Sequence, residues 1–368
     1  MENKKVLHIV SVSFSLRYFV GNQFHYFQEK GYEFHVACSD SPEFIVLSHE
    51  FGFTPFPVSI LRSINPLQDI KSIYTLYRYM RREQFDIVIA HSPKGGLIGM
   101  LAAYLARVPK RVFFRHGLVF ETVTGLKKHL LINIERLIGF CATNIVNVSP
   151  SVAKVSDRLH LNTSSKNELL GKGTCNGIDI AKFKPRLGFK DTTVVTIGFV
   201  GRLSRDKGLI DLIDTWKLLC IEYKSIRLLL IGPADERDPL PQATLDQIYG
   251  DPTIEYVGGV SNTSLYYNRM DIFVLPSYRE GFPTVTLEAS ASQLPIVTTK
   301  VTGCIDSILE DITGIYSENT AISLYRSIKY YLDHPDMIKD HGINGRMFVE
   351  DHFSENLIYK EIEEKLFK

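Results

Sequence analysis

The chain has 368 residues, of which 45% are hydrophobic and 23% are charged, a balance typical of globular domains. A chain of this length predicts two domains rather than one. The formal net charge of +1 gives no electrostatic basis for binding nucleic acid. Its five cysteines are scattered without a CxxC pair. This spacing argues against a zinc site or a disulfide framework and fits a reducing cytoplasm.

The N-terminal residues predict a β-strand rather than an export signal. The apolar run that follows the first lysines is short, alternates with polar residues and meets Arg17, unlike the continuous core of a signal peptide. No stretch reaches the roughly 18 apolar residues of a spanning helix, and the nearest, 95–106, is too short. Any contact with a membrane would therefore be peripheral.

Short β-branched runs alternate with amphipathic segments through the first half of the chain. The expected helices are 17–30 and 95–106. The expected strands are KVLHIVSVS (5–13), YEFHVACS (32–39), FDIVIAHSP (85–93), RVFFRHG (111–117) and ATNIVNVSP (142–150). Apolar strands that alternate with helices indicate a parallel sheet covered on both faces.

The alternation pauses at 175–190, a segment rich in Gly, Pro and Lys that reads as a connector. A second series of strands follows: VVTIGFVG (194–201), IRLLLIGP (226–233), IEYVGGV (254–260), DIFVLPS (271–277) and PIVTTK (295–300). We expect an α/β fold of two Rossmann-like, doubly wound domains. The first spans 1–185 and the second 190–350. A C-terminal helix at 351–368, with Ser354 as its N-cap, could pack on either domain. Ligands of such sheets bind beyond the carboxyl ends of the strands, here in a cleft between the domains.

The segment FVGRLSRDKG (199–208) follows the first strand of the second domain. Gly201 would let the backbone turn, and Arg202 and Lys207 would place two cations before a helix that starts near Gly208. A planar guanidinium, an ammonium group and the free amides of a helix start form a good diphosphate site. The alternative is that both residues are solvated loop cations.

The segment SYREGFPTVTLEAS (277–290) follows another buried strand. Pro283 suits the first turn of a helix, so Glu280 would lie in the loop before it and Glu288 on the helix. A carboxylate accepts hydrogen bonds from two adjacent hydroxyls, which predicts a sugar at one glutamate and a ribose at the other. The free amides of Gly281 and Phe282 would face an anion or a hydroxyl. Considered in isolation, Glu280 could instead be an acidic residue that interacts favourably with the helix dipole, and Glu288 could be a solvated helix residue.

Together these motifs resemble the retaining glycosyltransferases of family 4, which have the two-Rossmann GT-B architecture. The matching segments occur in order within 170–310. They are the connector pattern CNGID, FVGRLSRDKG, LLLIGPAD, IEYVGGV, DIFVLPSYREGFPTVTLEASASQLPIV and VTGCIDSI. The first domain is more divergent, as acceptor domains in such enzymes are. The resemblance also extends to bacterial enzymes that lengthen undecaprenyl-diphosphate-linked glycans.

The resemblance implies roles in binding a nucleotide-sugar donor. Arg202 and Lys207 would hold its diphosphate, Glu280 its sugar hydroxyls and Glu288 its ribose. Gly281 and Phe282 would supply backbone contacts, and Val257–Gly258 would border the nucleobase. His116, at the end of a first-domain strand, matches a cleft histidine of the family. We expect no metal and no cofactor, because the two cations and a helix N-terminus take over the metal's role.

The acceptor side is less defined in the sequence. We expect Ser13, Lys94 and Arg115 to contact the acceptor, each from a strand end of the first domain. Plain turns and a locally bonded His116 are the alternatives. The amphipathic segment 124–140, with Lys127 and Lys128 near its start, is either a membrane-facing segment or an ordinary core helix.

The resulting hypothesis is front-face transfer of a sugar, such as an N-acetylhexosamine from a UDP-sugar, with retention of configuration. The acceptor would be a glycan, free or linked to undecaprenyl diphosphate, in capsule, O-antigen or glycoprotein-glycan assembly. The enzyme would be cytoplasmic, at the inner face of the membrane where the acceptor is a lipid. Two alternatives remain: a sugar-nucleotide 2-epimerase of the same architecture, and a non-catalytic sugar-binding protein.

Overall fold

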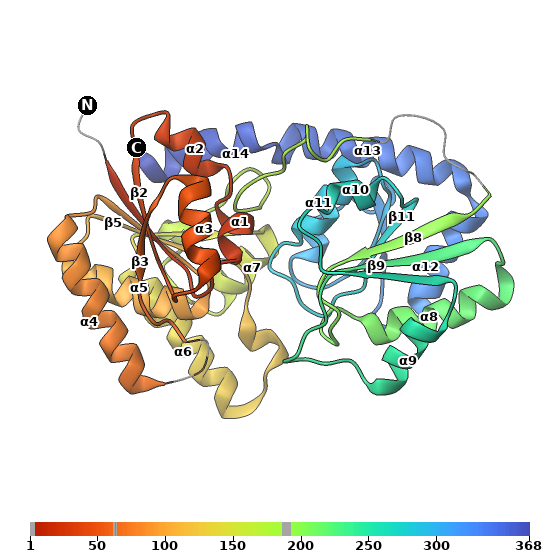
Figure 1. The fold of residues 1–368 in the computed structure, drawn as a ribbon, viewed down its shortest axis with the longest axis horizontal. Coiled ribbons are helices and arrows are strands. Elements are labelled where there is room, and N and C mark those ends of the chain that lie inside the picture. The colour runs from red at the N-terminus through yellow and green to blue at the C-terminus, as the bar shows by residue number, and fades with distance from the viewer. Residues whose placement is uncertain (1–3, 62, 64, 186–192) are drawn as a thin grey trace. The chain divides into compact units, whose positions relative to one another are not determined.

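The computed structural model describes residues 4–61, 63, 65–185 and 193–368 of the chain (Figure 1). It divides into two compact units, Met1–Gly177 with Asn356–Lys368, and Ile178–Glu355. Residues 178–185, which the sequence placed in the first domain, group with the second unit. This is because the segment bonds to the second unit's own helix, with the amide of Ile178 donating to the carbonyl of Phe353 at 2.7 Å. Part of the expected connector, 186–190, lies outside the described residues.

The first unit is built on a parallel sheet of seven described strands in the order β3-β2-β1-β4-β5-β6-β7. The strands are β1 (Lys5–Ile9), β2 (Glu33–Cys38), β3 (Thr54–Pro57), β4 (Ile87–His91), β5 (Lys110–Arg115), β6 (Asn144–Asn147) and β7 (Asn167–Glu168). The helices are α1 (Ser15–Phe19), α2 (Gln23–Gln28), α3 (Pro42–Phe51), α4 (Pro66–Glu83), α5 (Pro93–Ala106), α6 (Gly125–Cys141) and α7 (Pro150–Arg158), with 3-10 turns η1 (Val119–Thr122) and η2 (Ser164–Lys166). Strand order reverses between β1 and β4, the point where such sheets bind ligands.

The second unit repeats this plan with a parallel sheet in the order β10-β9-β8-β11-β12-β13. Its strands are β8 (Val195–Val200), β9 (Ile226–Ile231), β10 (Ile254–Gly258), β11 (Ile272–Leu275), β12 (Ile296–Thr299) and β13 (Gly314–Ser317). Its helices are α8 (Leu209–Glu222), α9 (Gln242–Gly250), α10 (Ser264–Tyr267), α11 (Thr284–Ala291), α12 (Ala321–Asp333) and α13 (Pro335–Phe353), with the 3-10 turn η3 (Cys304–Asp306). Here the order reverses between β8 and β11.

Each sheet carries its own hydrophobic core, made of strand residues and the inner faces of the helices. In the second unit Trp216 of α8 is fully buried, and its indole N–H donates to the Thr253 hydroxyl at 2.9 Å. The expected helix at 17–30 is wrong as a single element. It breaks into α1 and α2 at Gly21, whose φ of +50° lies in the left-handed region that a continuous helix excludes.

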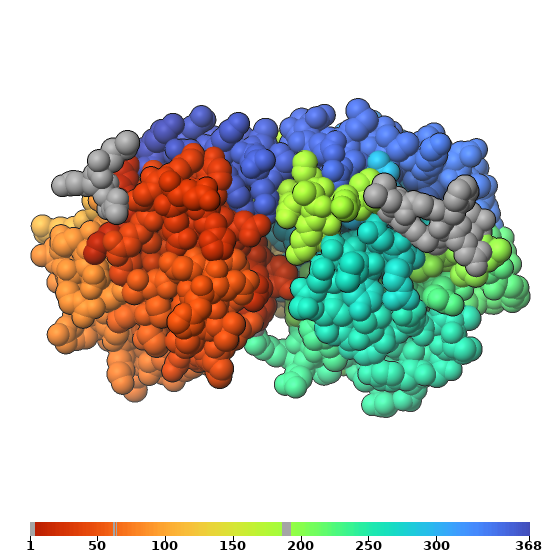
Figure 2. Space-filling model, turned by 45° about the horizontal axis from the view of Figure 1, so that its top comes forward, coloured from red at the N-terminus to blue at the C-terminus, as the bar shows by residue number. Residues whose placement is uncertain are grey.

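The C-terminal segment packs on the first unit. It comprises α14 (Glu355–Ile362) and a π-helical turn, η4 (Glu363–Phe367). Phe367 packs against Phe27, with ring centroids 4.5 Å apart, and its carbonyl accepts a hydrogen bond of 2.8 Å from Lys4. In Figures 1 and 2 the dark blue C-terminal residues lie directly against the red N-terminal ones. The chain therefore returns to the unit in which it began.

Candidate functional site

The loops that follow β8 and β11 meet at the switch point of the second sheet. These two strands are neighbours, with Phe273 opposite Gly198. Gly208, the N-cap of α8, has a φ of +72°, and a Cβ added there would lie 2.0 Å from the carbonyl oxygen of Pro276. Glycine is therefore required for the β8–α8 loop to approach the end of β11 this closely. The same loop contact brings the segment 199–208 close to the segment 277–290.

Lys207 and Glu280 form an ion pair across these two loops. Their side chains are only 17% and 11% exposed, so the pair is shielded more than a surface salt bridge. On the far side of Glu280, a Cβ added to Gly303 would lie 2.4 Å from the carbonyl oxygen of Gly281. The loop after β12 thus holds the Glu280–Gly281 backbone in place.

Arg202 is the more open cation, with 47% of its side chain exposed. Its guanidinium pairs with Asp235, in the loop after β9, and lies 3.4 Å from Asp206. Burial raises the pKa of Asp206, but a hydrogen bond from Ser204 and the charges of Arg202, Lys207 and Arg279 hold it below its usual value overall. The Asp206 carboxylate therefore stays ionised, and together with Asp235 it holds Arg202 at the strand ends.

The backbone bends at Gly201, directly after β8, as the sequence predicted. Gly201 has no left-handed backbone; that conformation belongs to Gly208 and to Gly232, whose φ is +136°. A Cβ on Gly232 would lie 1.9 Å from the Gly201 carbonyl. Gly201 is thus also the residue that the loop after β9 touches.

Glu288 lies inside α11, and its carboxylate accepts hydrogen bonds from Tyr267 at 2.7 Å and Thr263 at 3.5 Å. Burial raises its pKa to about 7, against the lowering effect of the bond from Tyr267. Pro283 is the N-cap of α11 rather than a residue of its first turn. The ring of Phe282 packs against that of Phe353, with centroids 5.5 Å apart. The part of Phe282 that lies at the start of α11 is therefore its backbone.

The segment Val257–Gly258 ends β10, next to β9. The Gly258 carbonyl accepts a hydrogen bond of 2.9 Å from the amide of Gly232. Gly258 has a φ of +82°, and a Cβ there would meet nothing within 4 Å. This strand end therefore faces open space, as a nucleobase would need.

Three histidines form a hydrogen-bonded chain across the first sheet. Nδ1 of His8 lies 3.1 Å from Nε2 of His91, and Nδ1 of His91 lies 2.9 Å from Nε2 of His116. The ring of Phe19 stacks on His116 with centroids 3.7 Å apart. Burial lowers the pKa of both His8 and His116 to about 3. For His91, burial and its two neighbours hold the pKa well below the ordinary value. All three rings are neutral at pH 7.

Arg115 does not fit the expected contact with an acceptor. Its side chain is fully buried, and four side chains accept its hydrogen bonds, those of Glu135, Asn147, Ser156 and Asn162. Burial raises the pKa of Glu135, while the charge of Arg115 opposes the rise. A guanidinium with every side occupied cannot reach a ligand, so Arg115 holds β5, α6 and α7 together.

Ser13 and Lys94 are also engaged within the unit. The Ser13 hydroxyl donates to the Glu43 carboxylate at 2.5 Å, and Nζ of Lys94 contacts Asp69 at 2.5 Å and the carbonyl of Ser63 at 3.0 Å. Either contact would have to open for the side chain to meet an acceptor.

The side chains that hold the predicted site residues in place were not identified from the sequence. Asp206 and Asp235 lie in motifs already singled out, directly after strands, which was the available signal. His8 and His91 carried none, because a lone histidine in an apolar strand usually marks a core position.

Two parallel doubly wound sheets, each with polar residues gathered at its switch point, are the architecture of the GT-B fold. Residues 194–334 match the family model described as glycosyl transferases group 1, and residues 5–148 match the one described as glycosyl transferase 4-like. The chain is 32% identical over 371 residues to the capsular polysaccharide biosynthesis glycosyltransferase CapM of Staphylococcus aureus, covering 99% of this chain and 97% of that one. The chain therefore belongs to the family 4-like glycosyltransferases, which confirms the resemblance.

Other relatives and solved structures agree. The chain is 26% identical over 261 residues to the Escherichia coli UDP-Gal:alpha-D-GlcNAc-diphosphoundecaprenol alpha-1,3-galactosyltransferase, covering 67% of this chain and 66% of that one. Its fold matches Anabaena HepE in complex with UDP, with a TM-score of 0.79, 16% identity and 99% of each chain covered. It also matches the Thermosynechococcus elongatus sucrose-phosphate synthase, with a TM-score of 0.80, 17% identity and 98% coverage of each chain. The expected α/β fold of two Rossmann-like domains is confirmed.

Proposed function

We propose that this glycosyltransferase moves a hexose or N-acetylhexosamine from a UDP-sugar onto a lipid-linked saccharide, with retention of configuration, in the assembly of a bacterial surface polysaccharide. The observation that carries the donor assignment is the Lys207–Glu280 pair beside Arg202 at the switch point of the second sheet. The setting is supported by the similarity to CapM, named for capsular polysaccharide, and to an enzyme named for a diphosphoundecaprenol acceptor.

The donor diphosphate would replace carboxylates as the partner of the two cations. Arg202 is held by Asp206 and Asp235, and Lys207 by Glu280. A diphosphate carries more charge than any one of these carboxylates and accepts a fork of hydrogen bonds from a guanidinium. Its arrival would release Glu280 to accept hydrogen bonds from the sugar, while Glu288 takes the ribose hydroxyls.

In the transfer step the bond from the anomeric carbon to the diphosphate oxygen breaks as a bond to the acceptor oxygen forms on the same face. The acceptor proton passes to the departing diphosphate. Lys207 and Arg202 would stabilise the charge that develops there, which is the term that most often dominates enzymatic rate enhancement. Because these cations already compensate the diphosphate, we propose that transfer needs no metal, and undiminished turnover in EDTA is the check.

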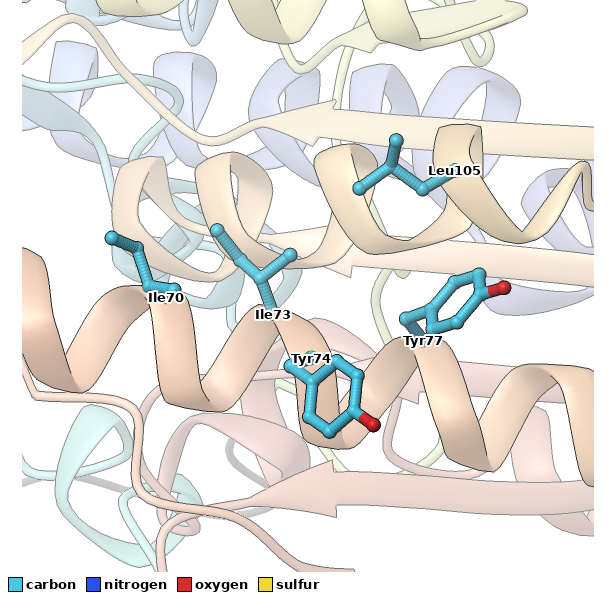
Figure 3. A pocket seen from close by; sticks show the side chains of 5 residues that line it. All are labelled: Ile70, Ile73, Tyr74, Tyr77 and Leu105. Carbon is cyan, nitrogen blue, oxygen red and sulfur yellow. The ribbon is translucent and has the colours of Figure 1, made fainter.

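The acceptor side would approach a membrane through helices α4, α5 and α6, where α5 packs against the other two. Apolar side chains are exposed on all three: Leu67, Ile70 and Tyr74 on α4, Tyr104 and Leu105 on α5, and Leu126, Leu130, Leu137 and Phe140 on α6. Figure 3 shows the apolar depression between α4 and α5, lined by Ile70, Ile73, Tyr74, Tyr77 and Leu105. We refer to this surface as the α4–α6 face.

Basic residues accompany these apolar ones. Exposed or half-buried cations on the same helices include Lys71, Arg78, Arg81, Arg82, Lys127, Lys128 and Arg136. Apolar side chains with basic neighbours are the combination that binds anionic lipid surfaces. Across the ranges that the structure describes, every helix is too short or too polar to cross a bilayer.

The test is incubation of the purified enzyme with UDP-sugars and an undecaprenyl-diphosphate-linked saccharide, with products followed by mass spectrometry. A lipid-linked product larger by one sugar, with the donor's anomeric configuration by NMR, supports the proposal. Conversion of the donor to its C2 epimer without acceptor would support the epimerase instead. The fold of this chain also matches that of a UDP-N-acetylglucosamine 2-epimerase, with a TM-score of 0.67 at 13% identity. Binding without either reaction would leave a sugar-binding protein.

A further inference from the structure

The histidine chain of the first unit follows from the register of three neighbouring parallel strands. His8 of β1 stands opposite Ile89 of β4, and His91 of β4 stands opposite Phe114 of β5. Alternate residues of a strand share a face, so His91 lies on the face of Ile89, and His116, just past β5, continues the face of Phe114. The three imidazoles therefore step diagonally across one face toward the carboxyl ends of the strands.

Each neutral imidazole has one N–H donor and one bare nitrogen acceptor, so the chain can run in only two directions. In one direction His8 donates to His91, and His91 donates to His116. In the other, each bond is reversed and His116 donates inward. The first leaves the proton of His116 on Nδ1, and the second leaves it on Nε2.

The buried end of the chain decides between these directions. His8 is 2% exposed, and its Nε2 has no hydrogen-bond partner in the described structure. The rings beside it are those of Phe24 and Phe34, with centroids 5.5 Å and 5.7 Å away, and these offer no oxygen or nitrogen acceptor. An orphaned buried N–H is rarer than an under-satisfied acceptor. The outward direction places a bare nitrogen at this end, whereas the inward direction would leave a buried N–H there without a partner.

We propose that His8 and His91 act as positioning residues, which fix the Nδ1–H tautomer of His116 and so make it a neutral hydrogen-bond donor. Its Nε2 is occupied by His91, and Nδ1 has no partner among the residues that the structure describes. The ring itself is held by the stacked Phe19. His116 would then donate this hydrogen bond to an oxygen of a bound saccharide. The use of this hydrogen bond by a substrate rests on the proposed transfer, whereas the assignment of the His116 tautomer does not.

The direct test is long-range proton–nitrogen NMR on the full-length, 15N-labelled protein without ligand, at pH 7. The ring nitrogens are assigned through bonds, so the wild-type spectrum is decisive even if a variant fails to fold. We expect the Nδ1–H form for His8, His91 and His116. A proton on Nε2 of His116, or an imidazolium ring there, would overturn the inference whether or not the enzyme transfers sugar.

The role of His91 is tested by two variants of similar size. His91→Leu removes the donor to Nε2 of His116, and the proton should then move to that nitrogen, since the partner of one ring nitrogen sets the tautomer. His91→Gln keeps an amide N–H that can donate to His116 and should retain the Nδ1–H signal. Where transfer is measurable, we expect kcat/KM to fall about tenfold in His91→Leu and to recover in His91→Gln. An unchanged His116 tautomer in a folded His91→Leu variant would contradict the role of His91.

Discussion

Lys207 donates a hydrogen bond to the Glu280 carboxylate, and this contact joins the loop after β8 to the loop after β11. The two residues lie far apart in the sequence but at the ends of neighbouring strands. The pair compensates both charges, so a donor diphosphate bound there, as proposed, would have to compete with Glu280 for the ammonium group. The enzyme thereby keeps a strong cation half-buried without a permanent unpaired charge.

Lys207→Ala tests this cation. We expect kcat to fall about 100- to 1,000-fold, the usual loss when one group that stabilises a developing negative charge is removed. The free energy of unfolding should change by no more than about 2 kcal/mol, since the pair is only partly buried. Steady-state transfer assays and chemical denaturation measure the two effects. Lys217→Ala, which removes a lysine that is 51% exposed on α8, is the matched control, and near-normal turnover of the Lys207 variant would remove the phosphate assignment.

Glu288 predicts a pH dependence of donor binding. Burial raises its pKa to about 7, so the carboxylate that would accept two ribose hydroxyls forms only as the pH rises through 7. We expect KM for the donor to increase several-fold from pH 8 to pH 6. Glu288→Gln should have a high KM throughout that range. A wild-type profile that is flat, or one that Glu288→Gln shares, would contradict the ribose assignment.

The same shift has a consequence for stability. The pKa of Glu288 is higher in the folded protein than its ordinary value of 4.5, so the folded state binds the proton more tightly. This contribution is complete below pH 4.5 and is lost as the pH rises through 7. Melting curves of Glu288→Gln and the wild type should therefore diverge across pH 4.5 to 7, with the wild type losing stability relative to the variant.

Substitution of Arg115 distinguishes a structural role of this residue from a role in binding the acceptor. Arg115→Ala leaves Glu135 buried without its cation, and removing one partner of a buried pair costs about 3–5 kcal/mol. We expect a corresponding fall in unfolding free energy, measured by urea denaturation. Arg136→Ala, on the exposed side of α6, the helix that carries Glu135, should change stability by less than about 1 kcal/mol. A stable Arg115→Ala protein with a raised acceptor KM would restore the contact expected from the sequence.

The donor-side motifs were predictable because local rules place them. Buried strands end at readable positions, and Gly208 marks the start of α8. The contacts of these side chains were not predictable to the same extent, because they depend on loops that meet in three dimensions. Gly208 was read as a helix start, yet its close approach to Pro276 is what brings Lys207 toward Glu280.

Arg115 and the histidines show the other limit of the sequence. A strand-end arginine reads as available to a ligand, and only the packing of α6 and α7 reveals that it is enclosed. His8 lies on β1, His91 on β4 and His116 just past β5, and no local pattern specifies the mutual register of these three strands. A shift of one residue in any strand would move its histidine to the opposite face of the sheet.

Gly208→Ala tests the loop contact itself. A Cβ would lie 2.0 Å from the Pro276 carbonyl oxygen, at a residue with a φ of +72°, so the β8–α8 loop must shift away from β11. We expect loss of stability and a fall in kcat comparable to that of Lys207→Ala, measured by thermal melting and transfer assays. Gly250→Ala is the control, because a Cβ there meets nothing within 4 Å. Normal activity of Gly208→Ala would show that the approach of the two loops is not needed.

The α4–α6 face predicts lipid-dependent binding. Leu130 and Phe140 are 50% and 64% exposed on α6, and insertion of such side chains into the interface favours binding by about 1–2 kcal/mol each. Leu130→Glu with Phe140→Glu should lower the binding to vesicles that contain anionic lipid at least tenfold in a sedimentation assay. Ile221→Glu, which changes a residue that is 74% exposed on α8, is the control for an added charge. Transfer to a water-soluble acceptor should be equal in all three proteins, because the donor site is untouched. Equal vesicle binding by the double variant and the wild type would exclude this face as the membrane contact.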